Sequence, residues 1–302
     1  MGLTPPSLKY IIKAKKKYQI KGPVLTFGNQ DIYATSSHVS KWIKNERLPL
    51  NLPEKIHYST SRTMAEINKE SERFIHAKTF FEMIGIAESQ YYDIDKFNFD
   101  KPRILHDLEK PFPAKYHNFF RLIIDSGTME HIFDIKAVME NIVKITKVGG
   151  YVLQMLPANN FLNHGFYQFS PTLFYDFYTN NGFEIVESYI IEIKSKIQRF
   201  HTYCQDRDYL GLYFNQNNRL GSLFLVRKKK HVRTIKSPAQ YIYVRLSKNA
   251  RAVSREWNKT WFDKIAAFCR QIVPFRYHGI FYNLWSLGKR ISSKRKYFDI
   301  PK

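Results

Sequence analysis

The chain has 302 residues and a mass of 35.9 kDa, and its 44% hydrophobic content excludes a globally disordered protein because it suffices for a core. The formal net charge is +22, and residues 229–302 hold 18 Lys or Arg residues against three acidic residues. Two cysteines exclude a disulfide framework, and no apolar run reaches the roughly 18–20 residues that span a bilayer. We therefore expect a cytoplasmic protein, either soluble or peripherally associated with a membrane.

Short apolar runs alternate with helical patterns through most of the chain. The predicted strands cover residues 24–27, 90–93, 103–106, 121–125, 151–156, 183–193 and 221–226. The predicted helices lie within 31–46 and over 72–84, 134–146 and 171–181, and a loop is predicted over 48–62. This alternation predicts a doubly wound α/β domain, in which helices cover both faces of a mostly parallel sheet.

Composition divides the chain into three parts. Residues 1–22 form a basic N-terminal lead-in, 23–228 the α/β domain, and 229–302 a basic, aromatic-rich and helical C-terminal extension. Apolar residues of the extension, between Trp257 and Ile272, share one face at helical spacing. Two interpretations stay open: a helix packed on the domain, or an amphipathic helix that binds an anionic membrane surface or nucleic acid.

Polar or small residues lie at or directly after the end of each of the first five predicted strands. They are Gly28, Asp93, His106-Asp107-Leu108, Asp125-Ser126-Gly127 and Pro157-Ala158-Asn159-Asn160. Ligands of open α/β sheets bind at the carboxyl ends of the strands. The pattern therefore predicts a nucleotide-like ligand across this edge of the sheet.

The segment from Phe120 to Phe183 carries a resemblance to a known family. The runs Ile124-Asp125-Ser126-Gly127-Thr128-Met129-Glu130-His131 and Lys147-Val148-Gly149-Gly150 resemble, in type and spacing, two segments of class I S-adenosylmethionine-dependent methyltransferases. The resemblance covers about residues 24–226. It implies a Rossmann-like methyltransferase sheet and S-adenosylmethionine as the cofactor.

The resemblance also implies a set of cofactor-binding residues. Asp93 would bind the ribose hydroxyls, since a carboxylate accepts two hydrogen bonds from a vicinal diol. Asp107 and Leu108 would lie beside the adenine, and Gly28 would let the backbone approach the methionine half. The full set is Gly28, Asn29, Gln30, Asp93, Asp107, Leu108, Asp125, Ser126 and Gly127.

The first loop departs from the family's acid-x-Gly-x-Gly-x-Gly pattern. It reads Thr26-Phe27-Gly28-Asn29-Gln30-Asp31-Ile32 and keeps only the first glycine. Thr26 replaces the acid that holds the cofactor's amino group, and Asp31 offers a carboxylate from a different position. This departure favours an alternative, a non-catalytic binding protein that keeps the methyltransferase fold.

The acceptor site is expected after the fifth strand. Residues 164–171 read His-Gly-Phe-Tyr-Gln-Phe-Ser-Pro and are similar to an HG-x-YQFSP segment of a bacterial subgroup. An oxygen or nitrogen acceptor must be oriented and can need a base. His164 is a candidate base with Tyr167 shaping the pocket, and Glu130 and His131 form a second candidate pair. For all four residues the alternative is a positioning or packing role.

The remaining histidines show no metal-ligand spacing, so the sequence predicts no metal site. The leading expectation is a methyltransferase for a small-molecule or glycan-type acceptor. A further alternative is an RNA or other nucleic-acid methyltransferase that uses the basic tail. No Gly-x-Ser-x-Gly turn or dinucleotide fingerprint is present, which argues against a hydrolase and an NAD enzyme.

Overall fold

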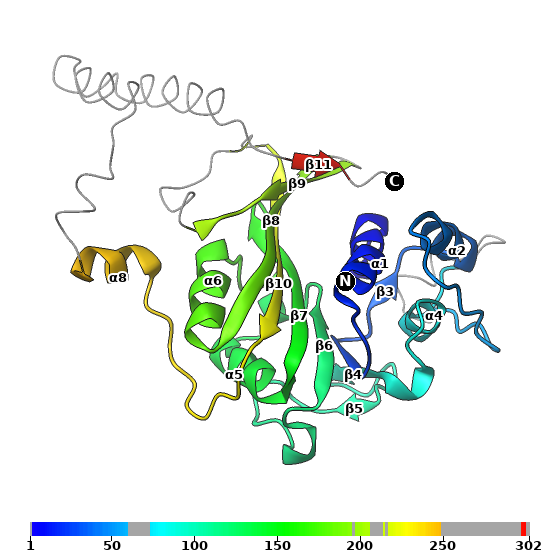
Figure 1. Cartoon of the computed structure of the whole chain (residues 1–302), viewed down its shortest axis with the longest axis horizontal. Helices are drawn as coiled ribbons and strands as arrows, with labels where there is room; N and C mark the ends of the chain where they lie inside the picture. Colours follow the sequence, from blue (N-terminus) through cyan, green and yellow to red (C-terminus); the bar gives the residue numbers. More distant parts are fainter. Residues whose placement is uncertain are drawn as a thin grey trace, which may run out of the picture.

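The structure is a computed structural model, and it describes residues 2–59, 73–194, 197–205, 214, 217–248 and 297–299. These residues form a central nine-stranded sheet and a two-stranded sheet, with helices on both sides of the large sheet (Figure 1). The helix expected between Trp257 and Ile272 lies outside the described residues, so both interpretations of the extension stay predictions.

The large sheet is mostly parallel, as the sequence predicts. Its order is β11 (Tyr297–Asp299), β9 (Ile197–Thr202), β8 (Phe183–Lys194), β10 (Arg219–Lys228), β7 (Thr146–Asn159), β6 (Phe120–Asp125), β2 (Val24–Phe27), β4 (Tyr91–Asp95) and β5 (Ile104–Leu105). The pairs from β5 to β7 are parallel, whereas β10 runs antiparallel to both β7 and β8. The chain proceeds outward from β2 to β5 and then crosses to β6, which creates a topological switch point between β2 and β6.

Helices cover the two faces of this sheet in separate groups. On one face lie α1 (Pro5–Tyr18), α2 (Ser36–Asn45) and α4 (Ala77–Met83), and on the other α5 (Ile135–Ile145) and α6 (Pro171–Asn180) (Figure 1). Alternate residues of β6 enter opposite cores: Leu122 and Ile124 pack on the α1 side and Ile123 on the α5 side. The predicted doubly wound, Rossmann-like α/β class is therefore confirmed.

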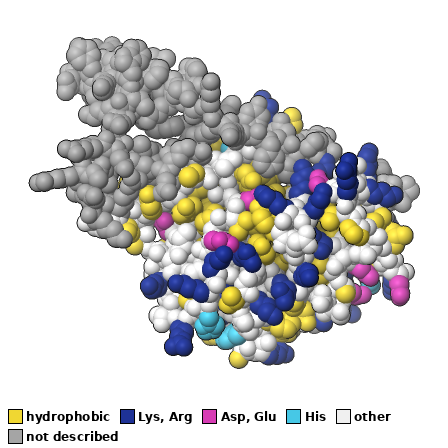
Figure 2. All heavy atoms as spheres, viewed as in Figure 1, with side chains coloured by type: hydrophobic (Ala, Val, Ile, Leu, Met, Phe, Trp, Pro, Cys, Tyr) yellow, Lys and Arg dark blue, Asp and Glu magenta, His cyan; other side chains and the backbone are white. Residues whose placement is uncertain are grey.

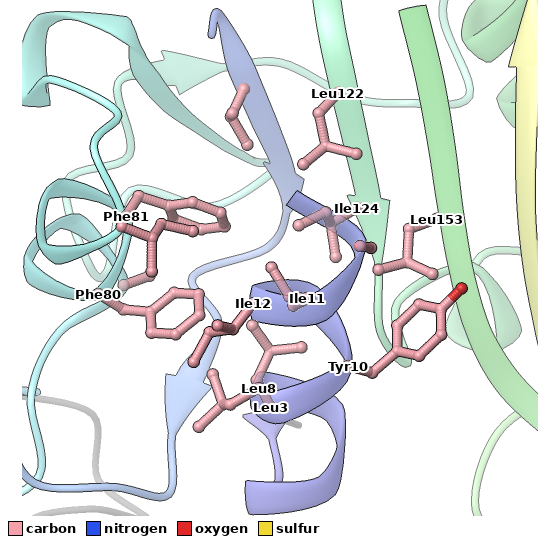
Figure 3. Packing of buried hydrophobic residues seen from close by; sticks show 14 of the residues in the cluster. Leu3, Leu8, Tyr10, Ile11, Ile12, Phe80, Phe81, Leu122, Ile124 and Leu153 are labelled. Carbon is pink, nitrogen blue, oxygen red and sulfur yellow. The ribbon is translucent and has the colours of Figure 1, made fainter. Parts of the chain in front are cut away.

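The N-terminal segment contributes a helix that the sequence pattern did not reveal. In α1, Leu8, Ile11 and Ile12 are at most 2% exposed. Figure 3 shows Ile12 beside Phe80 of α4 and Ile11 near Ile124 of β6. Part of the basic lead-in thus packs directly against the sheet. The short strands β1 (Gly2–Leu3) and β3 (Asp31–Ile32) pair in parallel beside it.

Several element ends differ from the predicted ones. The helix α5 begins after its N-cap Asp134, whose Oδ1 accepts from Ala137 N at 3.0 Å. It ends at Ile145, four residues before the glycines that were expected to stop it, and β7 begins at Thr146. Gly149 has a φ of +83° and lies within the irregular start of that strand. The glycines therefore shape the strand and do not end the helix.

The remaining elements are short. Three 3-10 helices cover Glu88–Gln90 (η1), Ala114–Tyr116 (η2) and Met129–His131 (η3), and α8 covers Tyr241–Lys248. The first residue of α8 donates its N–H to Asp176 Oδ2 in α6 at 2.9 Å. No helix within the described part of the chain combines the length and apolarity needed to cross a bilayer.

Candidate functional site

A cavity of about 560 Å³ lies at the carboxyl ends of β2, β4, β5 and β6. This is the switch point, where open α/β sheets bind their ligands. Its walls come from four loops and one residue beyond β7: Gly28, Asn29, Gln30, Ile94, Asp95, Lys96, Phe97, Asp100, His106, Asp107, Leu108, Glu109, Gly127, Thr128, His131, Ile132, Phe133 and Phe166.

The structure brings many of the predicted site residues to this cavity. Those that line it are Gly28, Asn29, Gln30, Asp107, Leu108, Gly127 and His131. Those outside its lining are Asp93, Asp125, Ser126, Glu130, His164 and Tyr167. The roles assigned to both groups remain predictions.

The loop after β2 lacks the later glycines of the family pattern. Hydrogen bonds of Gly28 and of the Gln30 side chain fix its conformation. Gly28 has a φ of +71°, a left-handed conformation that favours glycine, and its N–H donates to Ile94 O at 2.8 Å. Gln30 Nε2 donates to Phe27 O at 2.6 Å. Among the described residues, no group donates to the buried Gln30 Oε1. This loop therefore contains one buried acceptor to which no described group donates, on a residue that lines the cavity.

Neither Thr26, which replaces the family's acid, nor Asp31, the alternative carboxylate, lines the cavity. The Thr26 hydroxyl lies 2.8 Å from Tyr91 Oη and donates to Gly28 O at 3.2 Å. Asp31 is in β3, where its Oδ1 accepts from Ser59 Oγ at 3.2 Å, and it does not line the cavity.

Two aspartates of β4 occupy different environments. Asp93 is 4% exposed, and its Oδ1 accepts from Arg103 N at 2.9 Å. Asp95, the last residue of β4, lines the cavity, and its Oδ1 accepts from Phe97 N at 2.9 Å. Sequence reasoning missed Asp95 because it ended the strand at Asp93, although the alternating pattern continues to Asp95.

The loop after β5 carries further acids. Asp107 Oδ1 accepts from Glu109 N at 3.0 Å, and its Oδ2 lies 3.0 Å from Lys96 Nζ. Burial alone would raise the pKa of Asp107, but the Glu109 N–H and the Lys96 ammonium outweigh burial and lower it. Asp107 is therefore charged and fixed beside Leu108, which is 6% exposed.

Asp125 holds the turn after β6. It is fully buried, and its Oδ1 accepts from Thr128 N at 3.0 Å and from Met129 N at 3.4 Å. Burial raises the pKa of Asp125 to about 6, against the opposing effect of these hydrogen bonds. The contacts place Gly127 and Thr128 in the cavity wall, so Asp125 acts through its neighbours.

Glu130, His131 and His164 lie together at the edge of the cavity. Glu130 Oε1 is 3.6 Å from His164 Nε2 and 4.0 Å from His131 Nε2. The Glu130 side chain is 0% exposed, and neither of its oxygens accepts a hydrogen bond among the described residues. Burial, and then the nearby Asp125, raise the pKa of Glu130 to about 8. Of the three, only His131 lines the cavity itself.

The loop 164–171 folds back on residue 130. The N–H groups of Phe166 and Tyr167 donate to Glu130 O at 2.7 and 3.2 Å. The Tyr167 hydroxyl donates to Phe133 O at 2.9 Å, and Gln168 Oε1 accepts from Phe161 N at 2.9 Å. These two side chains therefore order the loop in this structure.

Comparisons with known proteins give no match to any family model or curated protein sequence. Solved structures do match. A candidate methyltransferase from Bacillus halodurans is 10% identical over 72% of this chain and 98% of its own, with a TM-score of 0.40. The YcgJ protein from Bacillus subtilis is 13% identical (74% and 98% covered, TM-score 0.36). A SAM-dependent methyltransferase from Methanosarcina mazei is 12% identical (70% and 95% covered, TM-score 0.35). The Rossmann-like fold itself follows from the strand order above.

Proposed function

We propose that this protein is an S-adenosylmethionine-dependent methyltransferase that acts on a small-molecule or glycan-type acceptor. The observation that carries the proposal is the cavity at the switch point, which is lined by a glycine turn after β2, a carboxylate at the end of β4 and the Asp107-Leu108 turn after β5. The resemblance of residues 24–226 to class I methyltransferases supports the same ligand.

The residues present fit this cofactor. The cavity volume of about 560 Å³ falls in the range of small-molecule sites. Its lining contains four acidic side chains, Asp95, Asp100, Asp107 and Glu109, against the single lysine Lys96. This excess of negative charge suits a ligand that carries a sulfonium and an ammonium group.

Each part of the cofactor has a group of the chain to hold it. We assign the ribose hydroxyls to Asp95, whose Oδ2 is not used by the Phe97 N–H, and the adenine to Asp107 and Leu108. Gly28 lets the backbone approach the methionine half, and Gln30 Oε1 accepts from its ammonium group. When bound, the cofactor supplies a methyl group on a sulfonium centre.

The acceptor side of the cavity is aromatic. Phe133 and Phe166 line it while remaining 72% and 68% exposed, with ring centroids 6.1 Å apart. Their faces offer an apolar contact for an acceptor, and the neighbouring His131 offers a polar one. This arrangement supports a small acceptor that is partly apolar.

Calorimetric titration of the full-length protein with S-adenosylmethionine and S-adenosylhomocysteine tests the proposal. We expect micromolar binding, and Asp95→Ala should weaken it by about 10- to 100-fold because hydrogen bonds to the ribose diol are lost. Asp93→Asn is the matched control: it keeps an acceptor for Arg103 N and should change the affinity by less than about threefold.

Two other outcomes of this titration would contradict the proposed function or the assignment of Asp95. If the wild-type protein binds neither ligand, the protein is a cofactor-free scaffold and the proposal is wrong. If Asp93→Asn abolishes binding while Asp95→Ala retains it, the ribose is held by Asp93, as the resemblance alone implied.

A further inference from the structure

We propose that Glu130, His131 and His164 bind a divalent transition-metal ion at the edge of the cavity. One ligand atom from each side chain lies within 4.8 Å of the other two. Two imidazole nitrogens and one carboxylate oxygen form a donor set that first-row divalent ions such as Zn²⁺ prefer, whereas Mg²⁺ and Ca²⁺ prefer oxygen ligands. The sequence predicted no metal site, and the proposal departs from that expectation.

The burial of Glu130 and its lack of hydrogen bonds give a second, independent observation in favour of an ion. Its side chain is 0% exposed, and its carboxylate oxygens accept no hydrogen bond from the described residues. A buried carboxyl group whose oxygens accept no hydrogen bond is costly and is rare in folded proteins. Oε1 is directed at the two imidazoles, so an ion between the three groups would supply the partner that these oxygens lack.

The backbone fixes the third ligand in place. His164 lies on the loop after β7, 34 residues beyond Glu130 in sequence, and two N–H groups of this loop bond to Glu130 O. A Cβ atom on Gly165 would lie 2.7 Å from Glu130 O, so the close approach requires glycine at this position. The loop therefore holds His164 against the Glu130-His131 pair.

The spacing allows an ion to enter with small movements. Metal–ligand bonds of about 2.0–2.2 Å in tetrahedral geometry separate the ligand atoms by roughly 3.4 Å. The Oε1 atom lies 3.6 and 4.0 Å from the two imidazole nitrogens. An ion between these atoms therefore requires Oε1 and the two nitrogens to approach by only about 0.2–0.6 Å. Three protein ligands leave a fourth position for water or an acceptor oxygen.

The test is metal binding by the full-length protein, freed of metal with EDTA and titrated without cofactor. Calorimetry with ZnCl₂ should show one ion per chain, and CoCl₂ should produce visible absorption bands of a low-symmetry site. His164→Gln and His131→Gln should each weaken Zn²⁺ binding at least about 10-fold. Glu130→Gln should do the same where circular dichroism shows that it folds.

His57→Gln is the matched control. His57 Nε2 lies 3.8 Å from Glu88 Oε2, so it is also a histidine facing a carboxylate, but it belongs to no described group of three ligands. This variant should bind Zn²⁺ as the wild type does. The absence of stoichiometric Zn²⁺ binding by the wild type, or equal weakening in His57→Gln and His164→Gln, overturns the proposal and leaves only a Glu-His ion pair.

Titration of the same samples with S-adenosylhomocysteine separates this inference from the proposed function. Metal binding without cofactor binding would contradict only the methyltransferase proposal. Cofactor binding without metal binding would contradict only the metal site.

Discussion

Gln30 is buried at the cavity with only one of its two polar atoms engaged. Its Nε2 donates to Phe27 O, while no described group donates to its Oε1. In the class I methyltransferases that this loop resembles, the position carries a glycine, so the Gln30 side chain adds a group that their loop lacks. A cofactor ammonium would donate to Oε1 and thereby replace the acid that Thr26 does not supply.

Replacement of Gln30 should distinguish its hydrogen bond to Phe27 O from its proposed contact with the cofactor ammonium. Both Gln30→Leu and Gln30→Glu lose the donor to Phe27 O, but only Gln30→Glu keeps an acceptor in place of Oε1. We expect Gln30→Leu to weaken S-adenosylhomocysteine binding by about 10-fold, near 1.4 kcal/mol, and Gln30→Glu to retain it. Calorimetry measures both, and wild-type affinity in Gln30→Leu would mean that the ammonium is held elsewhere.

Several of the residues singled out from the sequence lie at the cavity because they follow a strand, although their binding roles stay predictions. Gly28, Asp107 and Leu108 line the cavity for this reason. Asp95 was missed because the predicted strand ended two residues too early. The residue chosen as a site candidate depends on where the strand is predicted to end. The association of His164 with Glu130 was not visible as a metal motif, because fold topology and not local spacing brings the two together.

At the scale of elements, one carboxylate ties α1 to the far part of the sheet. Glu187 in β8 accepts from Tyr10 Oη and from Lys17 Nζ, both at 2.7 Å, and also from the hydroxyl of Tyr18. Burial would raise the pKa of Glu187, but these hydrogen bonds outweigh it and lower the pKa below its usual 4.5. The charged form therefore stabilises the docking of α1.

Glu187→Gln should lower the free energy of unfolding by about 1–3 kcal/mol at pH 7, because three donors of α1 and the Tyr189 hydroxyl lose a charged acceptor. A lowered folded-state pKa gives stability that is complete above the unfolded-state value and is lost as the pH falls through the folded-state value. The difference between wild type and variant should therefore shrink below pH 4.5.

Urea unfolding at pH 7 and at lower pH measures this difference. Glu184→Gln in the same strand is the control, because Glu184 is 43% exposed and pairs with Lys229 at the surface. We expect it to change the free energy of unfolding by less than about 0.5 kcal/mol. An equal effect of both substitutions would show that Glu187 has no special role.

The helices differ in how well their sequences reveal them. The helix α5 was predicted because Val138, Ile142 and their neighbours form a continuous apolar stripe. The helix α1 has buried residues at the same spacing. Its two leading prolines and the Lys15–Lys17 run instead favoured the interpretation of the segment as a basic N-terminal lead-in. Its burial depends on α4 and β6, which are distant in sequence, so local pattern alone could not establish it.

At the scale of the whole molecule, the net charge of the chain is positive, whereas the cavity lining is acidic. The chain carries a formal charge of +22, and Figure 2 shows Lys and Arg side chains spread over one face of the described residues. The cavity nevertheless has more acids than bases, with Lys96 shared between Asp107 and Glu109. A cationic ligand therefore meets local attraction within a protein of like overall charge.

The salt dependence of binding should show whether the acids of the cavity or the net positive charge of the whole protein dominates the electrostatics of binding. S-adenosylmethionine carries one positive charge more than S-adenosylhomocysteine, on its sulfonium. If the cavity acids dominate, raising NaCl from about 0.05 to 0.5 M should lower the affinity for S-adenosylmethionine by about two- to fivefold more than that for S-adenosylhomocysteine. A relative gain for S-adenosylmethionine would mean that repulsion by the whole protein outweighs the local acids.

The position of β10 has a consequence for how the protein is made. This strand lies between β7 and β8 and is hydrogen-bonded to both, yet it is synthesised after them. In a nascent chain that ends before residue 219, the edges of β7 and β8 that β10 will join stay open. Such edges promote aggregation, and long-range pairing is slow. Completion of the sheet therefore requires residues 219–228, and we expect the chain to be prone to aggregation until they are made.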